Sequence, residues 1–386
     1  MVGDAWICAS ELCKTRPLEE VLETEVKELK IDVEKLLEQN ARVIDELIER
    51  YIPRVYDKSA VVFSASPPRY DFSFEALNKA IADPIWDFLD RGGKRWRPSL
   101  FLLVVEALGG DSKSLQDFAI IPEVIHNGTI MIDDIEDDSE LRRGKPCTHK
   151  LLGLDVAINA GNSMYYLPLL TLIKNRDMID AGKFNRVYEI YTTEMINLSL
   201  GQAMDIAWHR GLADADKLTE TQYMQMCAYK TGTLARMAAK IAAVLCGASP
   251  DTVERLGRFA EALGIAFQIQ DDVLDLTTKE FAARKGGLGQ DITEGKRSLI
   301  VIHTLEKAKS ADKKRLISIL KMHTSDQKLK DEAMRIMKRH DSIEYAKQFA
   351  KKLVAESWKE VDRLLSPSEG KEKLKAFADY LVERSI

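Results

Sequence analysis

Cysteine is scarce in this sequence, and its spacing excludes a disulfide framework. The chain has 386 residues but five cysteines, an odd number scattered at positions 8, 13, 147, 227 and 246. Free thiols in such a pattern are typical of a reducing compartment, so we expect a cytoplasmic protein. Cys8 and Cys13 are close in sequence, but no neighbouring Cys or His completes a zinc site.

A basic surplus and long apolar runs are also missing. The formal net charge is -5, which argues against a general nucleic-acid binder. No uninterrupted apolar run reaches membrane-spanning length, so stable membrane insertion is not expected. The N-terminus lacks the basic start and the apolar core of a secretory signal, and it is too acidic for a typical organelle transit peptide. The composition, 45% hydrophobic and 30% charged, is that of a soluble globular protein.

Alternation with a period of two is scarce, whereas helical periodicity covers nearly every long segment. We therefore expect an all-α fold, with a single domain over residues 31–386 after a helical N-terminal extension over 1–30. A loop is expected around Pro53 and 64–68, and solvated amphipathic helices are expected after Asp312. Apolar helical runs are expected near 72–89, 100–108, 118–135, 156–173, 187–208, 224–245, 253–276 and 299–308.

The first long helix carries an apolar stripe. Apolar residues follow an alternating four-three spacing from Leu22 through Leu36 and Val43 to Leu47, and Asn40 fills one gap. The stripe fits a helix that pairs two subunits, with Asn40 as a polar register mark. It fits equally a first helix that packs on its own domain.

Two carboxylate clusters carry the functional argument. The segments 133–138 (DDIEDD) and 271–275 (DDVLD) each follow strongly apolar residues. On a helix, aspartates four residues apart share a face, where like charges repel and apolar surroundings add a desolvation cost. Mg2+ binds oxygen ligands and shares its shell with substrate phosphates, so the two clusters predict a metal-held diphosphate. A calcium-binding hand fits poorly, because Ile135 takes its third position and no Gly its sixth.

Basic residues accompany both clusters. One acidic cluster alone would fit a solvated helix end about as well as a metal site. Two copies of the pattern, each followed closely by basic residues, favour the metal site. Arg can bind phosphate through two hydrogen bonds, while Lys supplies a point charge. Carboxylates for metal together with separate cations indicate two phosphate-bearing ligands, one held through metal and one held directly. The cations are Lys94, Arg97, Arg142, Arg143, Lys230, Lys285 and Lys296.

These segments resemble those of the trans-isoprenyl diphosphate synthases. Residues 133–137 and 271–275 are similar to the two DDxxD motifs of that family. Residues 132–137 and 158–162 are most similar to geranylgeranyl diphosphate synthases of the eukaryotic type. Further matching segments, in family order, are GGKRWRP (92–98), LRRG (141–144), Gly201-Gln202 with Asp205, KTG (230–232), FQ (267–268) and DITEGK (291–296).

The resemblance implies an isoprenoid-synthase helical bundle around a deep central cavity, working as a homodimer. It implies three Mg2+ ions, which Mn2+ can replace. The implied reaction joins isopentenyl diphosphate to an allylic diphosphate (dimethylallyl, geranyl or farnesyl). Its products are a linear all-trans prenyl diphosphate and free diphosphate.

The resemblance also implies residue roles. The metal ligands would be Asp133, Asp134, Asp137, Asp271, Asp272 and Asp275. Arg142, Lys230, Gln268, Lys285 and Lys296 would bind the allylic diphosphate, and Lys94, Arg97, His126 and Arg143 would bind isopentenyl diphosphate. Lys230, Thr231, Gln268 and Lys296 would be catalytic. Lys285 lies one residue further from Gly289 than in many bacterial members, and Ile300 stands where the family often has Pro.

Product length should depend on how far the growing tail extends below the metal site. Gly128 lies five residues before Asp133, roughly 7.5 Å along a helix axis. A large aromatic side chain there would close the cavity, whereas Gly128 and Thr129 leave it open, which argues against a C15 limit. Tyr165 and Tyr166 are the next expected floor, although an aromatic pair would also fit a plain core. We expect a C20 product, with C25 or longer as the alternative.

Two other classes share part of the pattern. A class I terpene cyclase has the first acidic motif but needs no second diphosphate site, and its second motif is usually of the Asn-Ser-Glu type. A non-catalytic subunit of a hetero-oligomeric synthase tends to lose one acidic cluster. Both clusters and both sets of cations are present here, which favours an active synthase.

Overall fold

A computed structural model describes residues 31–278 and 287–383. Contacts divide the chain into two compact units, residues 1–32 and 33–386, and every helix and strand named below belongs to the second. The expected helical extension over 1–30 lies outside the described residues, as does Lys285. The domain boundary near residue 30 therefore stays a prediction.

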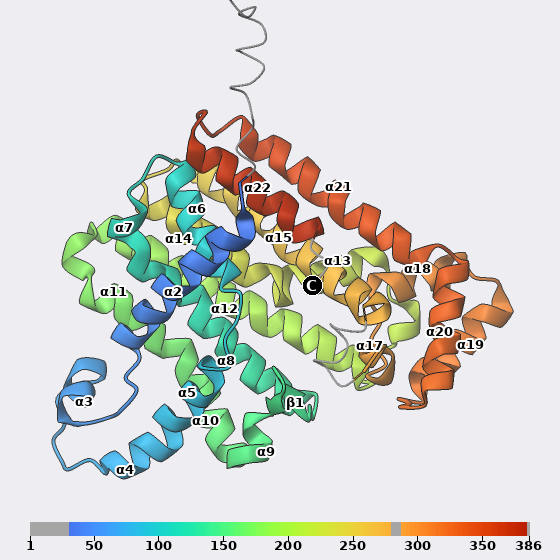
Figure 1. The fold of residues 1–386 in the computed structure, drawn as a ribbon, viewed down its shortest axis with the longest axis horizontal. Coiled ribbons are helices and arrows are strands. Elements are labelled where there is room, and N and C mark those ends of the chain that lie inside the picture. The colour runs from blue at the N-terminus through green and yellow to red at the C-terminus, as the bar shows by residue number, and fades with distance from the viewer. Residues whose placement is uncertain (1–30, 279–286, 384–386) are drawn as a thin grey trace, which may run out of the picture. The chain divides into compact units, whose positions relative to one another are not determined.

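The second unit is helical, as expected from the scarcity of period-two alternation (Figure 1). Its first half comprises α2 (Val33–Tyr51), α3 (Lys58–Ser64), α4 (Phe74–Leu77), a π turn η1 (Asn78–Ala82), α5 (Asp83–Leu89), α6 (Trp96–Ala107), α7 (Ser112–Leu115), η2 (Gln116–Ala119), α8 (Ile120–Glu136), β1 (Leu141–Arg142), β2 (Lys145–Pro146), α9 (Thr148–Leu152), α10 (Leu154–Tyr166), η3 (Leu167–Leu169), α11 (Leu170–Lys174) and η4 (Arg176–Met178). Its second half comprises α12 (Ala181–His209), η5 (Ala215–Lys217), α13 (Glu220–Lys230), α14 (Gly232–Leu245), α15 (Pro250–Thr277), α17 (Gln290–Thr293), α18 (Leu299–Lys307), α19 (Ser310–Lys321), α20 (Gln327–Arg339), α21 (Ser342–Asp362) and α22 (Glu369–Glu383).

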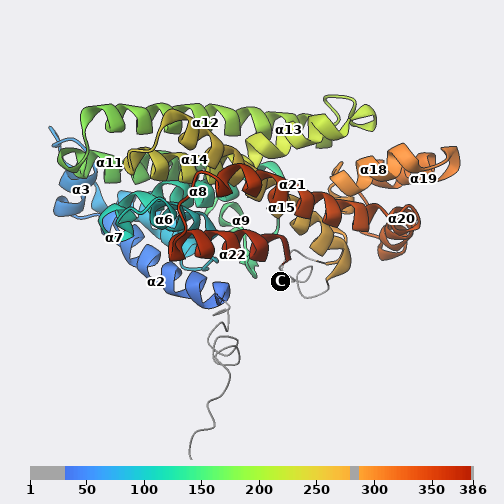
Figure 2. The ribbon, with the colours of Figure 1, turned by 90° about the horizontal axis from the view of Figure 1, so that it is seen from above.

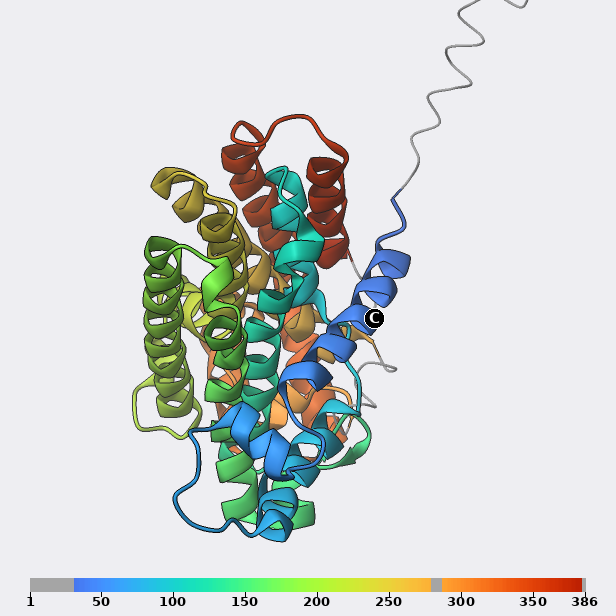
Figure 3. The ribbon, with the colours of Figure 1, turned by 90° about the vertical axis from the view of Figure 1, so that its left-hand side faces the viewer.

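The centre of this unit is formed by α14, whose residues are all buried except Lys240. A helix that is buried on nearly every side must be surrounded by other helices, and α14 packs against α6, α12 and α15. Figure 2 shows α12 on one side of the unit and α2 and α22 on the other, with α8, α14 and α15 between them. In Figure 3, α2 crosses the bundle on the side opposite α12.

The described part of the first helix packs on its own domain. Helix α2 contacts α6, α8 and α22, and its buried apolar residues include Leu37, Ile44 and Ile48. Val33 and Leu47 of the expected stripe are buried, whereas Leu36 and Val43 are replaced on the packed face by their neighbours Leu37 and Ile44. The reason is local, because apolar pairs such as Val43-Ile44 allow either of two neighbouring faces to be buried.

Four further expectations are corrected by the structure. The C-terminal helices are not merely solvated, because α21 packs along α15 and α22 along α6, burying residues such as Trp358 and Phe377. The run over 72–89 is interrupted by the π turn η1, and the run over 224–245 is divided at Thr231. The loop after Pro53 contains the short helix α3. Within 31–278 and 287–383, none of the helices combines the length and the apolar character that a membrane crossing requires.

Candidate active site

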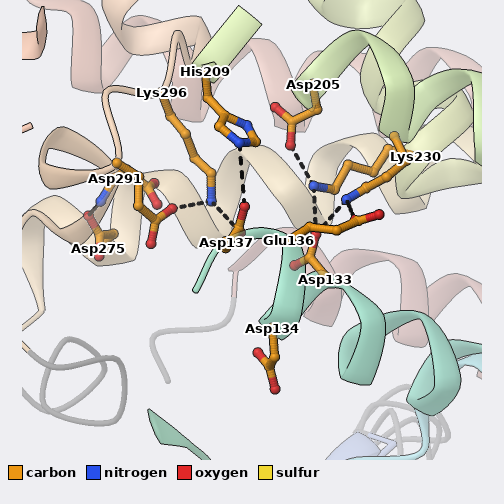
Figure 4. Close-up of polar contacts among 12 residues, drawn as sticks. Asp133, Asp134, Glu136, Asp137, Asp205, His209, Lys230, Asp275, Asp291 and Lys296 are labelled. Atoms are coloured by element: carbon orange, nitrogen blue, oxygen red, sulfur yellow. Dashed lines mark hydrogen bonds and ion pairs between the residues drawn. The ribbon is translucent and has the colours of Figure 1, made fainter. Parts of the chain in front are cut away.

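Helix α8 carries the first acidic motif to the wall of a cavity of about 550 Å3. Asp133 and Asp137 both line this cavity, one turn apart at the end of the helix. Asp133 Oδ1 accepts hydrogen bonds from Lys230 Nζ at 3.1 Å and from Gln202 Nε2 at 2.8 Å. Asp137 Oδ2 lies 3.9 Å from Lys296 Nζ (Figure 4). Two ammonium groups thus face the two carboxylates.

The surroundings shift the pKa values of these two carboxylates in opposite directions. Burial alone would raise the pKa of Asp133, but the charges of Lys230 and Lys296 outweigh it and hold that pKa below its ordinary value. The pKa of Asp137 is raised to about 7, first by burial and then by the negative charge of Asp133. The motif therefore carries less than its full formal charge at neutral pH, and an added cation would favour ionisation of Asp137.

Asp134 contacts a different cation, Arg142. Its carboxylate is buried and accepts hydrogen bonds from Nε (2.8 Å) and Nη2 of Arg142. Figure 4 shows it pointing away from Lys230 and Lys296. Arg142 itself lines the cavity, and it is the last residue of β1, in the tight hairpin that β1 forms with β2. In the structure Asp134 Oδ1 holds Arg142, and the predicted role of Asp134 as a metal ligand stays a prediction.

The second acidic motif lies on the last turns of α15, and its three aspartates differ in role. Asp271 and Asp272 line the same cavity as the first motif. Asp272 accepts from Tyr223 Oη at 2.9 Å and from Gln268 Nε2 at 2.8 Å. Asp275 is fully buried, and its two oxygens accept backbone N–H groups of residues 290 and 291 at 3.3 and 3.1 Å. The sequence predicts Asp275 as a metal ligand, but in the structure it anchors the start of α17.

The break between α13 and α14 brings Lys230 and Thr231 to the cavity. Thr231 has φ -105° and ends α13, and a Cβ on Gly264 would lie 2.6 Å from the Cα of Gly232. Two glycines therefore let α14 and α15 approach closely beside the break. Lys230 Nζ also contacts Asp205 Oδ2 at 2.5 Å, and Thr231 Oγ1 donates to Gln268 Oε1 at 3.1 Å. All four predicted catalytic residues, including Lys296, line the cavity.

Positive charge is concentrated around His126, at another part of the cavity wall. Arg97 and His126 both line the cavity. Burial and then the charges of Arg97 and Arg143 hold the pKa of His126 well below its ordinary value, so the imidazole is neutral. Lys94 is exposed in the loop before α6, with Nζ 6.0 Å from the Tyr380 ring. An excess of positive charge in one place favours an anionic ligand.

Only some of the residues predicted to set the product length line the cavity. Tyr165 and Thr129 line the cavity, whereas the Tyr166 side chain is 67% exposed and points to solvent. Gly128 is buried at the crossing of α8 and α10, where a Cβ would lie 2.7 Å from the Gly161 carbonyl oxygen and 3.3 Å from Tyr165 Cε1. The expected open space beside Gly128 is filled by α10 and the Tyr165 ring.

Known proteins share the sequence segments that form this site. The family model of polyprenyl synthetases matches residues 78–337, which include both acidic motifs and every cation group described above. The chain belongs to the polyprenyl synthetase family. The predictions of the family, the enzyme class and the all-α isoprenoid-synthase fold are thereby confirmed.

The names of relatives of this polyprenyl synthetase refer to prenyl products of several chain lengths. A short chain isoprenyl diphosphate synthase of Methanothermobacter thermautotrophicus is 37% identical over 76% of this chain and 87% of its own length. A geranylfarnesyl diphosphate synthase of Natronomonas pharaonis is 31% identical over 92% of this chain and 98% of its own. The crystal structure of geranylgeranyl pyrophosphate synthetase from Pyrococcus horikoshii matches with TM-score 0.77 and 31% identity, covering 92% of this chain and 100% of that one.

The residues around the cavity provide a donor set that fits Mg2+. Carboxylates from α8 and α15 line one cavity, and carboxylate oxygens are the ligands that Mg2+ prefers. Within 31–278 and 287–383, no three acidic, His or Cys side chains are gathered closely enough to hold a metal by themselves. Such a divided set suits Mg2+ that is shared with phosphate oxygens, because Mg2+ sites commonly use few protein ligands.

Sequence reasoning assigned no role to several polar residues of the cavity. Glu136 and Asp133 are bridged by the side-chain amide of Gln202, and His209 Nε2 lies 3.8 Å from Asp137 Oδ1. Gln202, Asp205 and His209 fall three and four residues apart on α12, so they share one helix face. Their spacing on α12 was the signal in the sequence that could have placed them together.

Proposed function

We propose that this polyprenyl synthetase joins isopentenyl diphosphate to an allylic diphosphate and that its main product is geranylgeranyl diphosphate (C20). One observation carries the proposal: two acidic motifs line a single cavity together with members of two separate sets of cations, Lys230 and Lys296 of one set and Arg97 of the other. One set, Lys230 and Lys296, contacts the acidic residues. The other, Arg97 with Arg143 near the neutral His126, suits a second diphosphate held without metal.

Asp133, Asp137 and Asp271 would hold Mg2+, with Asp272 beside them. Bound Mg2+ would neutralise and orient the allylic diphosphate as a leaving group. Lys230 and Lys296 would donate to the departing diphosphate, where negative charge grows in the transition state. Gln268 and Thr231 would lie beside the reacting carbons and help to position the allylic diphosphate. The predicted contribution of Lys285 stays a prediction, because that residue lies outside the described part of the chain.

The apolar part of the cavity would protect the allylic cation. Leu198, Leu234 and Phe267 line it, and Phe267 stacks on Trp96 with ring centroids 5.0 Å apart. Such a wall excludes water, which would otherwise trap the cation. Tyr165 would end the space for the product tail. The names of the relatives support both C20 and C25 products, and the aromatic floor favours C20.

We also propose that the enzyme is a homodimer. The surface of α10 exposes Ile158 and Tyr166, and that of α12 exposes Ile196 and Leu200, each between 39% and 67% accessible. On α12 the two residues lie one turn apart and form an unpartnered apolar stripe. Light scattering on the purified protein tests this proposal, and Leu200→Asp should give a monomer if the stripe pairs the subunits. A cytoplasmic location stays a prediction of the cysteine pattern.

A product assay tests the reaction. Purified protein would be incubated with radiolabelled isopentenyl diphosphate, Mg2+, and dimethylallyl, geranyl or farnesyl diphosphate in turn. A C20 product that EDTA and Asp133→Asn abolish would support the proposal. Asp138→Asn is the matched control, because Asp138 is in the same acidic segment but is 82% exposed and binds Lys150. Longer products would keep the reaction and refute the Tyr165 floor, and no condensation with any primer would refute the reaction.

A further inference from the structure

A buried polar chain of four side chains lies next to the second set of cations. Arg95 Nη1 donates to Glu123 Oε1 at 3.0 Å, and Asn127 Nδ2 donates to the same oxygen at 3.1 Å. Arg143 Nη2 then donates to Asn127 Oδ1 at 3.1 Å. Arg95, Glu123 and Asn127 are at most 3% exposed. The chain therefore runs from the core to Arg143, which lies beside His126 and was predicted to bind isopentenyl diphosphate.

Each member of the chain fixes the orientation of the next. Arg95 has φ 48° at the N-terminus of α6, and its guanidinium also donates to Asp45 Oδ1 at 2.9 Å and to the Leu89 carbonyl at 3.2 Å. Glu123 is thus held in one position on α8. The amide nitrogen of Asn127 donates to both the backbone carbonyl and the carboxylate of Glu123. Its oxygen must therefore point the other way, toward Arg143.

The charges around Arg143 indicate what it can bind. Burial lowers its pKa to about 10, and Glu123 opposes this shift while Arg95, Arg142 and Arg91 add to it. Its Nη1 is buried with no hydrogen-bond partner among the described residues. A buried donor without a partner is costly, so a cation with an open donor in this place suits an anionic ligand such as a diphosphate.

We infer that Arg95, Glu123 and Asn127 are positioning residues that orient Arg143 toward the acceptor diphosphate. The inference rests on the proposed function, because the acceptor site belongs to it. None of the three would touch substrate. They would hold the Arg143 guanidinium in its binding orientation before the diphosphate arrives, which reduces the entropy lost on binding.

The test separates the two substrate sites. Asn127→Leu keeps the size of the side chain and removes the acceptor for Arg143. We expect the Kd for isopentenyl diphosphate, measured by calorimetry without turnover, to rise about tenfold. The KM for the allylic diphosphate should change less than about twofold, because Asn127 contacts none of the residues assigned to it. Asn127→Ser, which is too short to reach Arg143, should give the same result if the leucine variant folds poorly.

Two further variants control for fold and charge. Asn175 makes a similar pair of contacts elsewhere, donating to the Thr171 carbonyl four residues back and to Tyr51 Oη. Asn175→Leu should lower the melting temperature without changing the Kd. Glu123→Gln keeps an acceptor in place and removes the negative charge, so the Kd should not rise.

The outcomes are distinct. An unchanged Kd in both Asn127 variants, or an equal rise in Asn175→Leu, would overturn the inference. Equal weakening of both substrates would also overturn it. If the unaltered protein forms no product with any primer, the proposed reaction fails, while calorimetry with isopentenyl diphosphate alone still tests the orientation of Arg143.

Discussion

Gly201 is a position where one added carbon should disable the enzyme. It lies on α12, and a Cβ built there would meet backbone atoms of α13: Lys230 N at 2.3 Å, the Tyr229 carbonyl carbon at 2.6 Å and Lys230 Cα at 2.9 Å. Ordinary contacts of this kind are near 3.4 Å or longer, and backbone atoms cannot rotate away. Gly201→Ala must therefore displace the end of α13 by about 1 Å.

That displacement has two consequences. Overpacking of this kind typically costs about 1–3 kcal/mol of folding free energy, which exceeds or cancels the roughly 1 kcal/mol that alanine gains over glycine in a helix. It also moves Lys230, whose ammonium lies 3.1 Å from Asp133. A misplacement of about 1 Å can reduce kcat about a hundredfold. Steady-state rates of product formation and thermal unfolding measure both effects.

A second glycine on the same helix provides the matched control. A Cβ on Gly182 would meet only the Asp180 side chain, at 3.2 Å. Gly182→Ala should therefore keep normal activity and should not lower the melting temperature. If Gly201→Ala retains kcat within about twofold of Gly182→Ala, the close approach of α12 and α13 does not position Lys230, and the argument is wrong.

Three other perturbations test separate parts of the site. Because the pKa of Asp137 is raised to about 7 and metal ligands bind in their ionised form, the affinity for Mg2+ with inorganic diphosphate should fall up to about tenfold per pH unit below 7. Calorimetry from pH 6 to 8 checks this, and a flat profile would contradict it. Tyr165→Ala should lengthen the product beyond C20, whereas Tyr166→Ala, at an exposed position, should leave product length unchanged in a chromatographic assay. Asp275→Ala should lose about 1–3 kcal/mol of stability in denaturant unfolding, because two backbone N–H groups lose their acceptor; an effect on metal affinity alone would refute that role.

The sequence predicts the kind of reaction better than it predicts which side chains face the cavity. Repeated motifs such as 133–137 and 271–275 indicate a function because their charges would be unfavourable on apolar helices without a ligand. The same pattern cannot say which carboxylate faces the cavity. Asp134 and Asp275 have the same side chain as their neighbours, but their partners, Arg142 and the backbone of 290–291, come from other segments. Such partners are fixed by tertiary packing alone.

Close approach is also invisible in a sequence. Gly128 suggests an open space, yet in the structure it is covered by Gly161 and Tyr165. Likewise, the adjacent apolar residues Val43 and Ile44 allow two faces of α2 to be buried, and contacts with α6, α8 and α22 decide between them. Gln202 matches a family segment but receives no role from the sequence, and His209 is not singled out there; their spacing on α12 places both on one face.

The anchoring of α17 by Asp275 constrains how this gene can change. The last carboxylate of the second motif accepts the N–H groups of residues 290 and 291, and Lys296 follows a few residues later. Selection at position 275 therefore acts on the placement of a phosphate-binding lysine, as well as on the acidity of the motif. Among natural variants, even an asparagine should be disfavoured at 275, because its single amide oxygen can accept only one of these two N–H groups and its NH2 group would face the other donor.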